Sequence, residues 1–330
     1  MAGRNMRYEL VTVFGGSGFI GRYVVRALAV RGYRVRVAVR RPELAGFMKP
    51  YGSVGQIQAI QTNLRFEDSV RRAVQGSDAV VNLVGILAEG GRQSFSKVHA
   101  EGAGLIARAA AEEGITRLTA VSAIGADEQS ESHYARTKAA GEAAIRDAVP
   151  GAVILRPSIM FGQEDQFFNR FAAMARMSPF LPLIGGGQTR FQPVFVGDVG
   201  EAVARAVDGK ATPGCTYELG GPEIRTFRQL MELMLHVIGR KRVLLNVPFG
   251  AADRLAGVLG ALPGRLLTTD QVIQLRHDNV VSQAAIEEGR TIEALGIDPV
   301  GMEAILPTYL QRFRRAGQFT NNVDTPRLQP

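Results

Sequence analysis

The residues from Val11 to Gly21 read VTVFGGSGFIG, an apolar run that continues into glycines spaced three residues apart. Gly15 permits a sharp reversal after a strand, Gly18 lets the backbone approach a pyrophosphate, and Gly21 lets the next helix pack closely. The start of that helix presents free N–H groups and a positive dipole end to phosphates. Because an apolar strand precedes the glycines and an amphipathic helix follows them, the pattern predicts a dinucleotide-binding turn rather than a purely structural one. The other residues expected to line this turn are Ser17, Phe19 and Ile20.

Apolar strands and amphipathic helices alternate through the first half of the chain. The expected strands are Leu10–Phe14, Arg34–Val39, Gln56–Gln61, Ala79–Val84, Arg117–Ser122 and Ala152–Arg156. The expected helices are Phe19–Arg31, Phe66–Gln75, Phe95–Glu113 and Ser132–Ala148. This repeated βαβ pattern predicts an α/β fold, a Rossmann-type doubly wound parallel sheet that binds its ligand at the carboxyl ends of the strands.

The alternation stops after Pro157, where a segment rich in proline and glycine leads to a strand at 194–196 and a helix at 200–207. We expect residues 1–157 and 190–222 to form an NAD(P)-binding Rossmann domain. Residues 158–189 and 223–316 are expected to form a smaller, more helical domain, and residues 317–330 a flexible tail. Asp198 and Glu201 fit a capping box, which we prefer to a catalytic role for Asp198.

The composition is that of an ordinary soluble globular protein, with 46% hydrophobic and 21% charged residues among 330. No apolar stretch approaches the ~18 residues that a transmembrane helix needs. Because the first expected strand begins near residue 10, we expect no signal peptide. The single cysteine, Cys215, excludes an intrachain disulfide and fits a reducing cytoplasmic compartment. We expect it to be a small buried residue of a strand.

The net charge is +8, and only five of the 39 basic residues are lysine. Arginines cluster at 34–41, 240–242 and 312–315. An anionic phospholipid surface or an acidic protein would fit this charge, whereas no nucleic-acid partner is expected because no nucleic-acid-binding motif accompanies it. A solvated basic surface without any partner is the alternative.

The end of the second expected strand distinguishes the two nicotinamide cofactors. NAD sites usually place a carboxylate there, whereas Arg40 and Arg41 occupy the position here and suit the 2′-phosphate of NADP(H). Two ordinary surface arginines are the alternative. Strands three and four are expected to hold the adenine and the rest of the cofactor through Asn63, Leu64, Val84 and Gly85.

Tyr134 and Lys138 stand four residues apart and therefore on one face of the expected helix. The lysine favours the phenolate and would anchor the nicotinamide ribose, while the tyrosine hydroxyl exchanges a proton with a carbonyl substrate. Ser122, at the end of the preceding strand, could bind the substrate oxygen. The four histidines show no metal-ligand spacing, so no metal site is expected.

Several segments resemble the extended branch of the short-chain dehydrogenase/reductase superfamily, in family order. They are GGSGFIG, NLVG, Ser122, YARTK, LRPSIMFG, PVFVGDV and YELGGPE. The resemblance also implies cofactor contact by Pro157. Segments 82–87, 156–172, 190–199 and 268–280 are similar to an atypical subgroup, the NAD(P)H-binding accessory subunits of respiratory complex I. That resemblance implies a structural NADPH and docking on the peripheral arm near the membrane.

The segment 251–262 carries an apolar stripe opposite Asp253 and Arg254. Its members are Ala251, Leu255, Val258, Leu259 and Leu262. The stripe predicts either the core face of the smaller domain, which we prefer, or a face that touches a membrane or a hydrophobic subunit.

Three function classes are compatible with these features. The first is a complex I accessory subunit with structural NADP(H), on the cytoplasmic face of the inner membrane. The second is a free NADPH-dependent carbonyl reductase or nucleotide-sugar-epimerase-like enzyme that uses Ser122, Tyr134 and Lys138. The third is a redox-sensing NADP-binding regulator, which has no distinctive feature in the sequence.

Overall fold

The computed structural model describes residues 9–259, 268–315 and 317. The chain forms two compact units: unit 1 comprises Met1–Pro157, Val196–Leu219 and Val281–Asp298, and unit 2 comprises Ser158–Phe195, Gly220–Val280 and Pro299–Pro330. Compared with the expected domains, residues 190–195 and 220–222 fall in unit 2, and residues 281–298 fall in unit 1. The expected tail, 317–330, lies outside the described residues except for residue 317.

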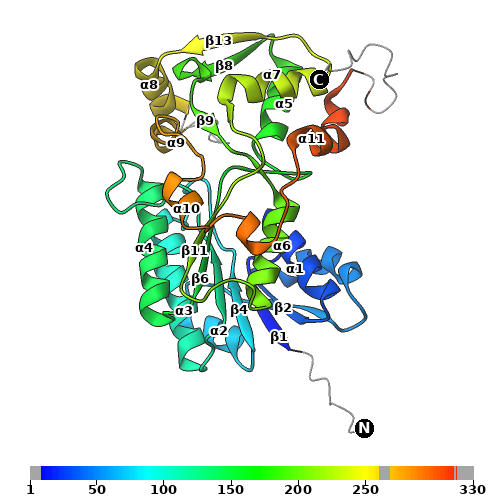
Figure 1. Cartoon of the computed structure of the whole chain (residues 1–330), viewed down its shortest axis with the longest axis vertical. Coiled ribbons are helices and arrows are strands. Elements are labelled where there is room, and N and C mark those ends of the chain that lie inside the picture. The colour runs from blue at the N-terminus through cyan, green and yellow to red at the C-terminus, as the bar shows by residue number, and fades with distance from the viewer. Residues whose placement is uncertain (1–8, 260–267, 316, 318–330) are drawn as a thin grey trace. The chain divides into compact units, whose positions relative to one another are not determined.

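Unit 1 is built on a parallel sheet in the order β11-β6-β5-β4-β1-β2-β3 (Figure 1). The strands are β1 (Leu10–Phe14), β2 (Arg34–Val39), β3 (Ile57–Gln61), β4 (Ala79–Asn82), β5 (Leu118–Val121), β6 (Val153–Pro157) and β11 (Thr216–Leu219). The strand order reverses between β1 and β4, which is the position where doubly wound sheets bind ligands. The predicted fold class is therefore confirmed.

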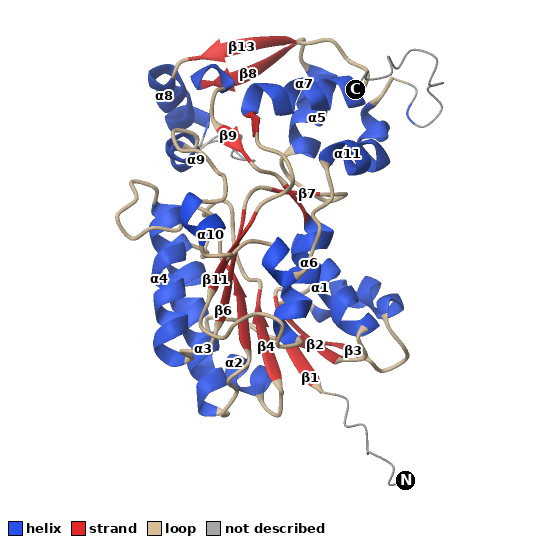
Figure 2. Ribbon diagram, in the orientation of Figure 1, coloured by secondary structure: helices blue, strands red, loops and turns tan. Residues whose placement is uncertain are grey.

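Helices cover both faces of this sheet (Figure 2). One face carries α2 (Glu67–Val74), α3 (Gly102–Glu112) and α4 (His133–Ala148), whose alanines and valines pack on the strands. The other carries α1 (Phe19–Val30) and α6 (Val196–Val207), which pack on each other. A 3₁₀ segment, η1 (Pro42–Tyr51), follows β2, and α10 (Gln283–Glu287) and η4 (Glu293–Leu295) complete the unit.

Two local predictions in or beside unit 1 are wrong, and a third holds with a change of helix type. The helix predicted from residue 200 begins at Val196, so Asp198 lies inside its first turn rather than at the cap, and β10 (Val194–Phe195) ends before it. Cys215 precedes β11 and is half-buried rather than enclosed in a strand. The predicted helix 95–113 is not uniform, because η2 (Ser96–Glu101) is a π-helical segment that runs into α3.

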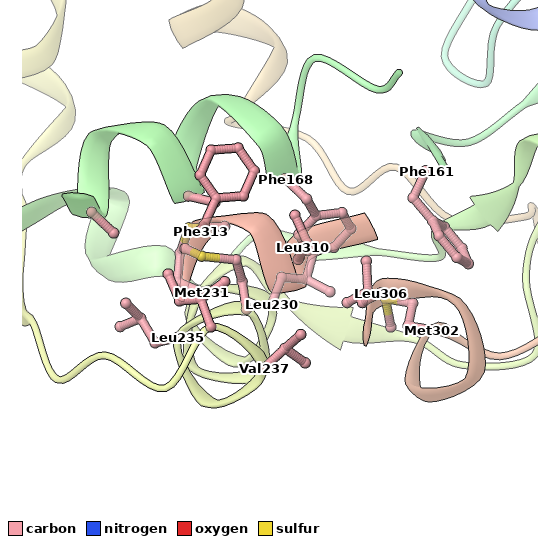
Figure 3. Close-up of a cluster of buried hydrophobic side chains, with 14 of the residues drawn as sticks. Phe161, Phe168, Leu230, Met231, Leu235, Val237, Met302, Leu306, Leu310 and Phe313 are labelled. Atoms are coloured by element: carbon pink, nitrogen blue, oxygen red, sulfur yellow. The ribbon is translucent and has the colours of Figure 1, made fainter. Parts of the chain in front are cut away.

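Unit 2 has its own hydrophobic core, shown in Figure 3. Three helices supply most of it: α5 (Phe168–Met177), α7 (Phe227–Val237) and α11 (Met302–Leu310), with η5 (Gln311–Phe313) after the last. The short strands pair as β7 (Met160–Phe161) with β10, β9 (Arg190–Phe191) with β12 (Arg225–Thr226), and β8 (Phe180–Ile184) with β13 (Val243–Val247). A 3₁₀ turn, η3 (Gly185–Gly187), follows β8.

The apolar stripe predicted at 251–262 lies on α8 (Phe249–Leu259), which packs against α9 (Thr269–Gln274). The predicted inward face is wrong by one position, because Ala252 and Ala256 are buried whereas Ala251 and Leu255 are exposed. The side chains of Val258 and Leu259, and all of Leu262, lie outside the described part of the chain. No helix that the structure describes is both long and apolar enough to cross a bilayer.

Candidate functional site

The glycine turn joins β1 to α1 at the carboxyl edge of the sheet. Gly15 has a φ of +79° and donates its N–H to the carbonyl of Ala38, 3.2 Å away. A Cβ on Gly21 would lie 2.4 Å from the Gly16 oxygen, so the fold itself requires that glycine. Gly18 is different: it is exposed, and an added Cβ would meet only the Gly15 oxygen, at 3.2 Å. Gly18 therefore leaves room for a ligand rather than for the protein's own packing.

The loop after β4 lies directly against this turn. A Cβ on Gly15 would be 3.3 Å from the carbonyl carbon of Leu83. The side chain of Asn82 fixes the loop by accepting a hydrogen bond from the Val84 N–H at 3.0 Å. The predicted cofactor residues Val84 and Gly85 thus follow the strand next to the glycine turn, as the reversal of strand order requires.

Tyr134 and Lys138 lie on the first turns of α4, which begins with Ser132 as its N-cap. The Lys138 ammonium is 5.9 Å from the centre of the Tyr134 ring and donates a 3.4 Å hydrogen bond to the carbonyl of Val121 at the end of β5. Burial lowers the pKa of Lys138 to about 8, and the carboxylate of Glu142 acts in the opposite direction. The lysine therefore stays mostly charged near neutral pH.

Ser122 follows β5 and is held by its backbone N–H, which donates to the Leu155 carbonyl at 2.7 Å. Its hydroxyl is buried and has no hydrogen-bond partner within the described residues. Ser122, Lys138 and Val84 line a cavity of about 20 Å³, room for one water molecule. Buried hydroxyls are normally paired, so the unpaired one indicates a place where a ligand or water binds.

His99 is a site residue to which the sequence assigned no role. It lies on η2, is 3% exposed, and its ring centre is 5.2 Å from that of Tyr134. The Ile86 N–H donates to Nε2 at 3.1 Å, so in the neutral ring Nδ1 carries the proton and donates to the Thr137 hydroxyl at 3.2 Å. Burial and the nearby Lys138 ammonium lower the pKa of His99 to about 3. His99 is therefore a neutral link between the loop after β4 and α4.

Glu142 is a second residue of the site that the sequence did not single out, although it stands four positions after Lys138. Its buried carboxylate accepts two hydrogen bonds from the Arg156 guanidinium, both at 2.8 Å. The ion pair holds α4 against β6 beneath the lysine. The four-residue spacing from Lys138 was the only signal in the sequence that could have indicated it.

The residues predicted for the adenine end lie at the ends of β2 and β3. Arg40 directly follows β2, Arg41 follows it, and both are exposed. The Asn63 side chain accepts a hydrogen bond from the Arg65 N–H at 3.2 Å, and Leu64 packs against Gly102. Each lies at or just beyond the carboxyl end of a strand, as predicted. The interactions described for these residues do not include Tyr134 or Lys138.

The remaining predicted residues lie in or next to unit 1's regular elements. Phe19 and Ile20 open α1, Ser17 precedes its cap, and Pro157 ends β6, where its carbonyl accepts from the Ile124 N–H. Within the described ranges, no three His, Cys, Asp or Glu side chains are grouped so as to hold a metal ion.

Comparison with known proteins identifies the family. The NAD dependent epimerase/dehydratase family matches residues 11–220, from β1 to the end of β11. The chain belongs to this family. Its helix–sheet arrangement also matches the NADPH-dependent quinone oxidoreductase QOR2 of Escherichia coli, solved with NADPH, at a TM-score of 0.70 and 17% identity over 92% of this chain and 99% of that one.

Two curated relatives extend the comparison beyond the family segment. The chain is 35% identical to "NADH dehydrogenase [ubiquinone] 1 alpha subcomplex subunit 9, mitochondrial" of Arabidopsis thaliana, over 93% of this chain and 79% of that protein. It is 31% identical to the ceramide reductase of Caulobacter vibrioides, over 72% of this chain and 74% of that protein. The similarity to the first relative therefore extends over most of both units.

The site fits the nicotinamide cofactor of this family. The exposed Gly18 gives a pyrophosphate access to the start of α1, and the buried Ser122 hydroxyl still needs a partner. When bound, a nicotinamide supplies a ring that accepts or donates hydride. The chain's own side chains would position it and move protons: Lys138 provides a buried cation, and Tyr134, whose ring centre is 5.9 Å from that cation, provides a hydroxyl.

Proposed function

We propose that this chain is an accessory subunit of NADH:ubiquinone oxidoreductase that holds NADPH as a structural ligand. The observation that supports this most is the extent of the similarity. The match to the plant subunit covers 93% of this chain, whereas the match to the ceramide reductase covers 72%. A match over most of both units favours a shared role for the whole protein rather than for the nucleotide-binding unit alone. The subunit acts at the cytoplasmic face of the inner membrane as a peripheral protein and stabilises the arm of the complex that lies outside the bilayer.

The proposed NADPH site uses the edge of the sheet described above. The pyrophosphate lies on Gly15, Gly18 and the start of α1, and the nicotinamide end contacts Tyr134 and Lys138. The other proposed contacts are Ser17, Phe19, Ile20, Gly21, Arg40, Arg41, Asn63, Leu64, Val84, Gly85 and Pro157.

The choice of NADPH over NADH rests on the two exposed arginines after β2. We expect Arg40→Ala to weaken NADPH binding by about 1.5–3 kcal/mol, because a charge-assisted hydrogen bond to the 2′-phosphate is lost. NADH affinity should change little, since its ribose carries no phosphate. Titration of the native chain and of Arg40→Ala with NADPH and with NADH measures the change in affinity. Equal affinity of the native chain for NADH and NADPH would contradict the assignment.

The second candidate is a free NADPH-dependent reductase or epimerase. The observation in its favour is that Ser122, Tyr134 and Lys138 lie at one edge of the sheet, with a buried lysine whose pKa is lowered to about 8. A cofactor-anchoring site would keep the same Tyr134 and Lys138, so the pair fits both candidates.

Fractionation separates the two candidates. We expect the native chain to remain in a large complex with respiratory subunits when membranes are solubilised in a mild detergent. In a density gradient, the chain should peak in the same fractions as the other subunits of the peripheral arm. A chain found entirely in the soluble fraction as a monomer would exclude the accessory-subunit role.

A further inference from the structure

One face of the small β8–β13 sheet in unit 2 is apolar and uncovered. The two strands run parallel with Phe180 opposite Val243 and Pro182 opposite Leu245, so these four side chains share one face. Phe180 is 48% exposed, Val243 54% and Leu245 45%. We call these four residues the outer sheet face. Apolar side chains exposed side by side indicate contact with a partner or a membrane.

The opposite face of the same sheet packs inward. Leu181 and Leu183, which alternate with the outer residues of β8, are fully buried in the core of unit 2 that Figure 3 shows in part. At the far end of the outer face, α8 covers the last pair, because Ile184 and Val247 pack with Ala252. The helix thus closes one end of the face and leaves the first two pairs of residues open.

Basic side chains lie close in sequence to the first residues of both strands. Arg176 lies in the last turn of α5, before β8, while Arg240, Lys241 and Arg242 lead into β13. Arg240 donates to the carbonyl of Phe313, two residues before Arg315, and Arg242 donates to that of Ala175, the residue before Arg176, so these side chains lie near one another. Burial, followed by the guanidinium groups of Arg242, Arg315 and Arg176, lowers the pKa of Arg240 accordingly. We call Arg176, Arg240, Lys241, Arg242 and Arg315 the basic rim.

Within the described ranges, the basic rim has no acidic partner. Arg240 and Arg242 donate to backbone carbonyls, those of Phe313 and Ala175, rather than to carboxylates. Among the residues that the structure describes, no ion pair joins any member of the rim to Asp or Glu. Clustered like charges without counter-ions are unfavourable, and an external anionic surface would relieve that repulsion.

We propose that the outer sheet face and the basic rim together form a docking surface for an anionic phospholipid bilayer. This inference deepens the proposed function, on which it rests, by naming the residues that meet the membrane. A bilayer interface offers phosphate groups to the rim and acyl chains to the apolar residues at the same time. Nucleic acid would pair the arginines but leave the apolar residues in water. Leu255 of α8, the helix that covers the end of the face, is also exposed.

Vesicle flotation of the purified full-length chain tests this proposal. We expect binding to vesicles of phosphatidylcholine with phosphatidylglycerol, weaker binding to phosphatidylcholine alone, and weakening by salt. The combined change Arg176→Gln, Lys241→Gln and Arg315→Gln should lower affinity for anionic vesicles on the order of 100-fold. These three side chains are exposed, so the melting temperature should not change.

Two further variants complete the test. The double change Val243→Ser and Leu245→Ser should lower the affinity for vesicles measured at high salt by a factor on the order of 10, because less apolar surface enters the bilayer. Arg26→Gln, Arg34→Gln and Arg72→Gln make the same change in net charge on exposed residues of unit 1, and should leave binding nearly unchanged. Equal losses in the rim variant and this control would mean that net charge alone attracts the chain, and would overturn the proposal.

Failure of the docking surface and failure of the proposed function give different experimental results. If the native chain binds anionic vesicles through the rim but fractionates apart from the respiratory complex, the accessory role is wrong and the docking surface stands. If the chain stays in the complex but binds no vesicle, the docking surface is wrong. If the rim variant binds vesicles normally but leaves the complex, the surface contacts protein, and the bilayer proposal is also wrong.

Discussion

Gly18→Val is expected to abolish nucleotide binding while leaving the nucleotide-free chain nearly as stable as the native one. A Cβ at this position would make one close contact in the free protein, 3.2 Å to the Gly15 oxygen, which a shift of a few tenths of an ångström in this exposed turn would relieve. A bound pyrophosphate would instead meet the valine side chain. Thermal unfolding should therefore be unchanged without NADPH. With ligand at a thousandfold excess over the dissociation constant, the variant should lack a stabilisation of about 4 kcal/mol.

Tyr134→Phe is the matched variant for this experiment. It keeps the ring that packs beside His99 and removes only the hydroxyl, so cofactor binding and assembly of the complex should stay close to normal. Gly18→Val should reduce assembly if NADPH is structural. NADPH oxidation with a panel of carbonyl compounds is measured alongside. Robust turnover by the native chain that vanishes in Tyr134→Phe would replace the accessory role with that of a reductase.

Gly141→Val should lower the free energy of unfolding by about 4 kcal/mol. A Cβ on Gly141 would lie 2.1 Å from the carbonyl oxygen of His99, so α4 and η2 must move apart. That movement displaces His99 from Tyr134 and Lys138, and NADPH binding should weaken together with stability. Urea unfolding and NADPH titration measure the two effects.

The control for this change is Gly257→Val on α8. Both glycines are helical, but a Cβ on Gly257 would meet nothing within 4 Å. The intrinsic helix preferences of glycine and valine differ by only a few tenths of a kcal/mol, so the control should be nearly neutral. Similar losses at both positions would show that backbone preference, rather than the close approach of η2, makes Gly141 necessary.

Much of unit 1 follows from short-range pattern in the sequence. The glycine spacing and the apolar strands predict the turn at Gly15–Gly21, the parallel sheet and the position of the ligand edge. Tyr134 and Lys138 are recognisable because their spacing of four places them on one helix face wherever the helix lies. These features depend on neighbouring residues alone, so they can be read before any tertiary contact is known.

The tertiary structure decided what depends on contacts between distant segments. His99 enters the site only because η2 packs on α4, where Gly141 admits its carbonyl, and no local pattern in the sequence predicts a π-helical segment. The inward face of α8 differs by one position from the predicted stripe, because Ala252 and Ala256 fit against Ile184 whereas Leu255 does not.

The composition of the basic rim also depends on tertiary structure. The sequence shows clusters at 240–242 and 312–315, but only folding brings Arg176 and Arg315 near Arg240. Charge and hydropathy along the chain determine which residues are available for a surface. Which of these residues come together on one surface depends on strand register and on helix packing between segments that are distant in the sequence. Both are determined by the free energy of the whole folded chain, and no single segment fixes them.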